Sequence, residues 1–130
     1  MVDGDTIDCV LDLGFSILHK CRVRLYGIDT PESRTRDLDE KARGKLASKF
    51  LEDSIKNGKE VILRSELKDS KGKYGRVLGS IVVDDLDINQ AMVEQNLAVK
   101  YFGQSKADVE AEHMLNRQKL IDSGAYVPDL

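Results

Sequence analysis

The chain has 130 residues, 20 Lys and Arg against 23 Asp and Glu, and a formal net charge of -3. This length suits one compact domain, and a hydrophobic content of 41% with 2 prolines excludes a wholly disordered chain. No apolar run approaches the roughly 20 residues that a membrane span needs, and no signal-peptide pattern opens the sequence.

The first half of the chain predicts a hairpin followed by a helix. Two β-rich segments, residues 6–11 and 17–27, flank a glycine-containing turn and indicate a long hairpin. Residues 29–32 form a loop, because the proline in this segment lacks a backbone donor and favours extended geometry before it. Residues 38–56 then carry the apolar spacing of an amphipathic helix.

The second half predicts two strands and two helices. The strands cover residues 60–67 and 74–83, with a basic, glycine-containing loop between them. Asn89 is expected to cap a short helix that ends at Ala98. A last helix begins after Ser105, and its expected apolar stripe is Ala111, Met114, Leu115, Gln118 and Ile121. With no linker or repeat, residues 1–130 are interpreted as one α+β domain.

The charge is distributed unevenly along the chain. Counted by segment, residues 1–19 carry -4, residues 20–76 carry +6 and residues 77–130 carry -5. Solvated helix faces explain part of this pattern. The remainder favours a polyanionic partner bound mainly by the central segment.

The cysteines and histidines do not have the spacing of a zinc site. If the first hairpin forms as predicted, Cys9 and Cys21 face each other across it. Without a signal peptide, we expect two reduced, half-buried thiols in preference to a disulfide.

Three short segments concentrate residues that can carry chemistry: residues 2–6, 24–32 and 73–76. Each segment alone is typical of an ordinary turn or loop. Together, the carboxylates of Asp5 and Asp29 and the backbone carbonyl of Thr30 provide hard oxygen ligands. Such ligands suit Ca²⁺ or Mg²⁺ and disfavour zinc.

The remaining charged residues of these segments complete the set needed to attack a phosphodiester. Glu32 follows the ligand segment and can orient or deprotonate a water molecule. Arg24 and Arg76 can each bind two phosphate oxygens with their planar guanidinium groups. A cation, a carboxylate beside a water and two arginines are the groups that in-line attack requires.

In this order, the three segments resemble the staphylococcal nuclease (thermonuclease) family. The resemblance implies an OB-fold, a five-stranded β-barrel with three helices. Only Met1 and Val2 precede the Asp-Gly-Asp-Thr motif, so the first barrel strand is expected to be truncated. The resemblance also implies Ca²⁺-dependent cleavage of DNA and RNA that leaves 3′-phosphate and 5′-hydroxyl ends.

The resemblance assigns roles by position in the sequence. One Ca²⁺ ion would be held by Asp5, Asp29 and Thr30, catalysis would use Arg24, Glu32 and Arg76, and substrate would be bound by Lys71, Lys73, Tyr74 and Tyr101. The sequence departs from the family at Gly72, where the best-known member has an acid. The paired tyrosines of the family's nucleotide pocket are replaced by Tyr101-Phe102-Gly103.

These observations predict a monomeric nuclease that prefers single-stranded DNA and RNA and has no membrane partner. The alternative is a catalytically inactive OB-fold module that binds single-stranded nucleic acid. As the sequence stands, a cytoplasmic protein is expected, or a secreted one if a leader has been removed.

Overall fold

The computed structural model describes residues 3–65 and 76–128, with the side chain of Arg76 left out. These residues form three helices and a mixed sheet, in agreement with the expected α+β class. In chain order the elements are β1 (Thr6–Asp12), β2 (Leu18–Leu25), β3 (Ile28–Asp29), α1 (Leu38–Asn57), β4 (Val61–Ser65), β5 (Arg76–Val83), β6 (Leu86–Asp87), α2 (Ile88–Glu94), β7 (Val99–Lys100) and α3 (Lys106–Asp122).

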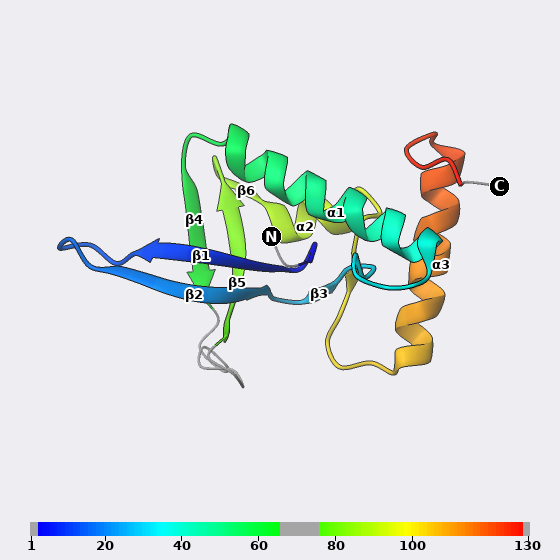
Figure 1. Cartoon of the computed structure of the whole chain (residues 1–130), viewed down its shortest axis with the longest axis horizontal. Helices are drawn as coiled ribbons and strands as arrows, with labels where there is room; N and C mark the ends of the chain where they lie inside the picture. The colour runs from blue at the N-terminus through cyan, green and yellow to red at the C-terminus, as the bar shows by residue number, and fades with distance from the viewer. Residues whose placement is uncertain (1–2, 66–75, 129–130) are drawn as a thin grey trace.

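The main sheet has five strands in the order β1-β2-β5-β4, and the short β6 pairs with β5. All pairs are antiparallel except β2 with β5. Figure 1 shows the β1–β2 hairpin crossing the direction of β4 and β5, so the sheet is strongly bent. Among the strands that the structure describes, the sheet does not close into the expected barrel. A separate two-stranded ladder pairs β3 with β7.

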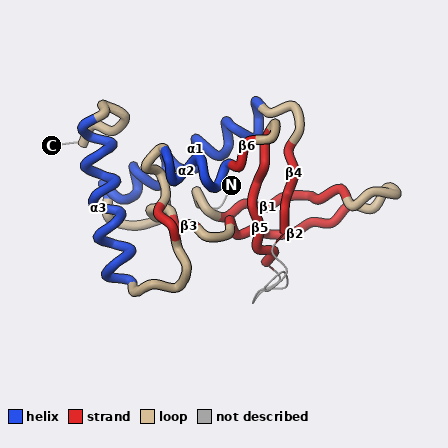
Figure 2. Tube along the Cα trace, turned by 180° about the vertical axis from the view of Figure 1, so that it is seen from behind, coloured by secondary structure: helices blue, strands red, loops and turns tan. Residues whose placement is uncertain are grey.

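The predicted first hairpin is confirmed, and Cys9 lies directly opposite Cys21 in it. The distal end of the hairpin extends beyond the rest of the molecule in both views (Figures 1 and 2). This end is apolar and exposed, with Phe15 at 99% and Leu18 at 67% relative exposure. Apolar side chains that are this exposed contribute no burial free energy to the fold.

The core lies between the sheet and α1. The helix runs along the sheet in Figure 1 and contributes Ala47 and Leu51, both with 0% exposure. The sheet and α2 contribute the other large enclosed side chains, which are Val23, Leu25, Ile88 and Met92. Burial of this apolar surface is the main stabilising contribution to the fold.

The helix α2 begins two residues earlier than predicted, and its cap is Asp87 rather than Asn89. The Asp87 carboxylate accepts a hydrogen bond from the Gln90 amide at 3.1 Å, and the helix ends at Glu94 rather than at Ala98. Asn89 is 4% exposed and bonds to the neighbouring strand instead. Both residue types can cap a helix, so sequence alone did not separate them.

The expected start of α3 is confirmed, because the Ser105 hydroxyl accepts a hydrogen bond from the Asp108 amide at 3.2 Å. Its predicted apolar stripe is wrong: Leu115 is 63% exposed. The buried residues of the helix are Val109, His113 and Leu120. The reason is that α3 packs through a face that also makes polar contacts to the rest of the chain.

A cluster of side chains around Asp39, which we call the Asp39 cluster, joins α1 to α3. The Asp39 carboxylate accepts hydrogen bonds from Arg43 at 3.1 Å, from Arg117 at 3.0 Å and from the Tyr126 hydroxyl. Burial acts to raise the pKa of the Asp39 carboxyl, but the hydrogen bonds and the arginine charges outweigh it and lower this pKa. The cluster therefore fixes α3 beside the N-terminal end of α1.

Within the described ranges, none of the helices combines the length and the apolar character that crossing a membrane would require.

Candidate active site

Asp5 lies in the turn that leads into β1 and is 9% exposed. One carboxylate oxygen accepts a hydrogen bond from the Thr6 hydroxyl at 3.1 Å. The other accepts from the backbone amide of Thr30, also at 3.1 Å. The second bond joins residues 25 positions apart in the chain and brings two of the predicted ligand segments together.

Asp29 lies in β3, where it pairs with Val99 of β7. Its Oδ2 atom is 2.8 Å from Nε2 of His113. His113 belongs to α3 and is 5% exposed. Sequence reasoning missed His113, since a single histidine in a helix has no distinguishing pattern. The contact joins residues 84 positions apart. It makes α3 part of the site.

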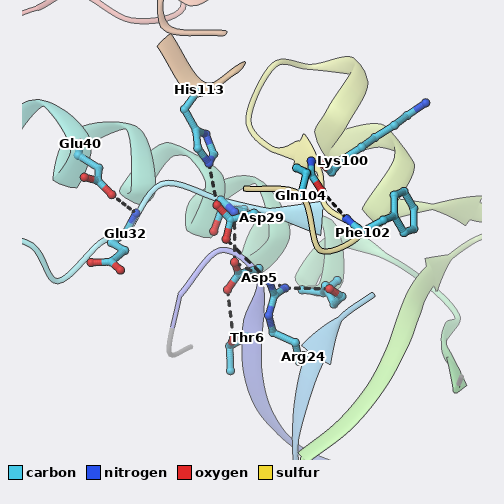
Figure 3. Close-up of polar contacts among 12 residues, drawn as sticks. Asp5, Thr6, Arg24, Asp29, Glu32, Glu40, Lys100, Phe102, Gln104 and His113 are labelled. Carbon is cyan, nitrogen blue, oxygen red and sulfur yellow. Dashed lines mark hydrogen bonds and ion pairs between the residues drawn. The ribbon is translucent and has the colours of Figure 1, made fainter. Parts of the chain in front are cut away.

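Arg24 lies beside both carboxylates (Figure 3). Its guanidinium nitrogens are 3.6 Å from Oδ2 of Asp5 and 3.8 Å from Oδ1 of Asp29, and one donates to the carbonyl of Leu25 at 2.9 Å. The first two distances exceed those of good hydrogen bonds. The carboxylates of Asp5 and Asp29 therefore share the guanidinium group of Arg24, and neither forms a tight ion pair with it. A bound cation would compete with Arg24 for these two carboxylates.

Thr30 is 5% exposed, and its hydroxyl has no hydrogen-bond partner among the described residues. Glu32 is exposed, and Figure 3 shows its side chain apart from Asp5 and Asp29. Its backbone amide donates to the Glu40 carboxylate at 3.0 Å. Four of the predicted residues thus lie together, and Glu32 lies at the edge of the group. The four are Asp5, Arg24, Asp29 and Thr30.

Two close approaches of backbone to α1 position the segments that carry the carboxylates. A methyl group added at Gly44 would lie 2.7 Å from the carbonyl oxygen of Pro31, and one added at Gly4 would lie 2.7 Å from the Ala47 side chain. Neither separation is compatible with a normal contact. Helix α1 therefore supports both the turn before Asp5 and the loop after Asp29.

Arg24 also faces a hollow of about 370 Å³ that is lined by aromatic side chains. Tyr101, which is 40% exposed, lines this hollow together with Tyr26 and Phe102. The rings of Tyr26 and Phe102 meet edge to face with centroids 6.0 Å apart. From the sequence, only Tyr101 of these three was assigned to substrate binding; Phe102 was noted as its neighbour, and Tyr26 was given no role.

Glycine at position 27 allows this arrangement. Gly27 has a φ of +76°, and a side chain there would approach the Phe102 ring to 3.2 Å. Its carbonyl accepts a hydrogen bond from the Tyr101 amide at 2.8 Å. The tight turn after β2 therefore positions the aromatic residues beside Arg24.

The remaining predicted site residues lie within or next to residues 66–75, which the structure does not describe. Lys71, Lys73 and Tyr74 lie outside the described residues, as does the side chain of Arg76. The backbone of Arg76 begins β5 and pairs with Arg22 of β2, two residues before Arg24.

The oxygen atoms present fit a hard cation better than a soft one. Among the described residues, no group of three or more His, Cys, Asp or Glu side chains forms a metal cluster. The candidate protein ligands are the two carboxylates of Asp5 and Asp29, with Thr30 beside them. The unpartnered, buried hydroxyl of Thr30 indicates that this side of the site is suited to a further polar group.

A profile described as staphylococcal nuclease homologue matches residues 22–121, which contain Arg24, Asp29 and Arg76. The chain belongs to the staphylococcal nuclease family. The predicted family resemblance is thereby confirmed.

Several curated relatives carry nuclease names. A thermonuclease of Staphylococcus intermedius is 34% identical over 98 residues, which cover 75% of this chain and 54% of the relative. The SPbeta prophage-derived endonuclease YokF of Bacillus subtilis is 29% identical, covering 98% of this chain and 44% of the relative. Endonuclease YncB of the same organism is 27% identical, covering 97% and 61%. The chain thus spans about half the length of these relatives.

Proposed function

We propose that this protein is a Ca²⁺-dependent nuclease that hydrolyses DNA and RNA and leaves 3′-phosphate and 5′-hydroxyl ends. The observation that carries the proposal is the position of Arg24. It faces both Asp5 and Asp29, at 3.6 Å and 3.8 Å, and also lines the aromatic hollow. Membership of a nuclease family supports the same activity.

In the proposed site, the carboxylates of Asp5 and Asp29 and the carbonyl of Thr30 would hold one Ca²⁺ ion. When bound, the ion would supply positive charge to polarise the scissile phosphate and to lower the pKa of a water molecule. Hard oxygen donors such as these are the preferred ligands of Ca²⁺. The contact from His113 to Asp29 holds that carboxylate in one orientation.

Arg24 and Arg76 are proposed to bind the phosphate and to stabilise the charge that develops as water attacks phosphorus. A guanidinium group suits this role because it donates two parallel hydrogen bonds to phosphate oxygens. Glu32 is proposed to orient or deprotonate the attacking water. Its exposure would leave room for a water between its carboxylate and the substrate.

The proposed substrate contacts extend from the arginines in two directions. Tyr101 would stack on a base, which favours single strands because a stacked base must leave the duplex. Lys71, Lys73 and Tyr74 would contact the flanking phosphates. A monomer can supply all of these groups.

We also propose that the bent sheet corresponds to the OB-type barrel of the family. The β1–β2 hairpin crossing β4 and β5 supports this assignment, as does the family itself. The whole chain would then be one nuclease domain.

The proposal is tested by incubating the protein with heat-denatured DNA in Ca²⁺ and in excess chelator. Cleavage is expected only with Ca²⁺. In the same assay, Arg24→Ala should lower kcat by roughly 100-fold to 1,000-fold, the usual effect of removing one transition-state donor. Arg22→Ala is a matched control, because Arg22 lies on the same strand but pairs with exposed Asp8 at 2.8 Å.

Two results would contradict the proposal. Equal cleavage with and without chelator would exclude the metal site, and equal rates for the Arg24 and Arg22 variants would exclude the phosphate role of Arg24. Binding of single-stranded DNA without cleavage in Ca²⁺ would instead favour a non-catalytic binding module.

A further inference from the structure

The β1–β2 hairpin carries both cysteines of the chain. Cys9 and Cys21 are directly opposed, their sulfur atoms are 4.0 Å apart, and both are free and half-buried. The proposed nuclease mechanism gives neither cysteine a role. Two thiols at this distance are a candidate site for covalent modification.

The Cα spacing of the pair falls within the range of disulfides. The Leu25 amide bonds to the Asp5 carbonyl at 2.8 Å, and the Leu13 amide to the Ile17 carbonyl at 2.9 Å. Hydrogen-bonded pairs alternate along an antiparallel ladder, so Cys9 and Cys21 also form one, with Cα atoms about 5.5 Å apart. Disulfides commonly span about 4.4–6.8 Å between Cα atoms. The sulfurs need to approach by about 2 Å. Opposed Cβ atoms of a hydrogen-bonded pair lie up to about 5.5 Å apart, against about 3.5–4.5 Å in a disulfide, so bond formation requires side-chain rotation and a closer approach of the two strands.

The pair is also accessible to a small reagent. Asp8, Val10 and Lys20 surround the two cysteines and line with them an open hollow of about 420 Å³. A disulfide-exchange reaction requires such access, because the incoming sulfur must align with the sulfur that it attacks.

We propose that Cys9 and Cys21 form an intramolecular disulfide by exchange with a small-molecule disulfide such as oxidised glutathione. In the first step, the thiolate of one cysteine attacks the reagent, forms a mixed disulfide and releases one glutathione thiolate. The second cysteine then attacks the protein sulfur of that mixed disulfide and releases the second glutathione. The protein loses two protons and two electrons, and the reagent takes them up to become two glutathione thiols.

The rate of the reaction should depend on pH. Burial, together with the charge of and the hydrogen bond to Cys21, raises the pKa of Cys9 to about 11. Below that value, attack through Cys9 therefore becomes about tenfold faster for each unit by which the pH is raised, because only the thiolate reacts.

The disulfide would join two strands that lead directly to the candidate site. Strand β1 begins after Asp5, and Arg24 of β2 pairs with Thr6 of β1. A bond between Cys9 and Cys21 closes a loop in the unfolded chain and thereby reduces its entropy. For a loop and a protein of this size, the melting temperature should rise by about 10 °C.

The test uses the full chain, incubated with oxidised glutathione at mildly alkaline pH, then quenched with acid, alkylated with a maleimide and weighed by mass spectrometry. The expected product has lost about 2 Da, takes up no maleimide and remains the same size in gel filtration. Its melting temperature is about 10 °C higher, and dithiothreitol reverses the change.

Two single variants are the controls. Cys9→Ser and Cys21→Ser should each stop at a glutathione adduct, without the rise in melting temperature. The proposal is overturned if the unmodified sequence keeps free thiols or glutathione adducts in excess reagent, or forms a disulfide-linked dimer. It is also overturned if either single variant gains the same thermal stability.

Discussion

Asn89 offers the sharpest test of how the fold supports the site, through the substitution Asn89→Ala. Its side-chain oxygen accepts a hydrogen bond from the Ile81 amide at 3.2 Å. Its side-chain nitrogen donates to the carbonyls of Tyr26 at 3.0 Å and Gly79 at 3.2 Å. One side chain from α2 therefore ties β5 to the turn between Arg24 and Asp29.

The cost of Asn89→Ala follows from these three bonds. A buried polar group that is left without its hydrogen-bond partner costs about 1–3 kcal/mol. The Gly79 carbonyl keeps a hydrogen bond from the Tyr26 amide at 2.8 Å, so it is not left unpaired. The Ile81 amide and the Tyr26 carbonyl lose the contact from Asn89. We expect a loss of about 3–4 kcal/mol in the free energy of unfolding, and a melting temperature lower by about 10–15 °C.

The assay is urea unfolding followed by circular dichroism, with Gln90→Ala as the matched control. Gln90 is the next residue of α2 and its side chain is exposed, so its substitution should change the free energy of unfolding by less than about 0.5 kcal/mol. A cost below about 1 kcal/mol for Asn89→Ala, or an equal cost for both variants, would refute the reasoning.

Three further predictions concern the site and its supports. Removing the contact from α3 to Asp29 with His113→Ala should weaken Ca²⁺ binding by roughly tenfold in titration calorimetry, whereas Met114→Ala, an exposed neighbour, should leave it unchanged; equal affinities would contradict this. Asp39→Asn should lower the free energy of unfolding by about 1–2 kcal/mol at pH 7. Because the pKa of Asp39 is lowered in the folded state, this difference is present above about pH 4 and disappears as the pH falls through the folded-state pKa; urea unfolding at several pH values would reveal a pH-independent difference if the interpretation is wrong. Gly44→Ala should reduce both stability and cleavage, because the added methyl group displaces the loop that carries the site; unchanged cleavage and melting temperature would contradict it.

The parts of the fold that were predictable from the sequence have local signals. The first hairpin is specified by alternating apolar residues and turn residues, and the start of α3 by the capping side chain of Ser105. Both elements lie at the expected positions. The convergence of Asp5, Arg24 and Asp29 was also anticipated, through the order of three motifs.

The parts that were missed depend on contacts between distant segments. The β3–β7 ladder is two residues long on each side, too short for a pattern. The apolar spacing of α3 favoured Leu115, while the Asp39 cluster and the contact to Asp29 turn His113 inward. No property of a sequence window around His113 encodes an interaction with a residue 84 positions away.

The close packing of Gly4 and Gly44 against their neighbours has a consequence for surveys of all single substitutions in this chain. Neither residue has a side chain that could touch a nucleic acid, yet any side chain at either position would collide with its surroundings. Their tolerance to substitution should therefore be as low as that of the charged residues they support. Ranked by tolerance alone, these glycines would be mistaken for chemical participants. Measuring thermal stability beside cleavage would separate the two kinds of residue, because a glycine variant loses both, whereas a variant of Arg24 loses turnover and keeps its stability.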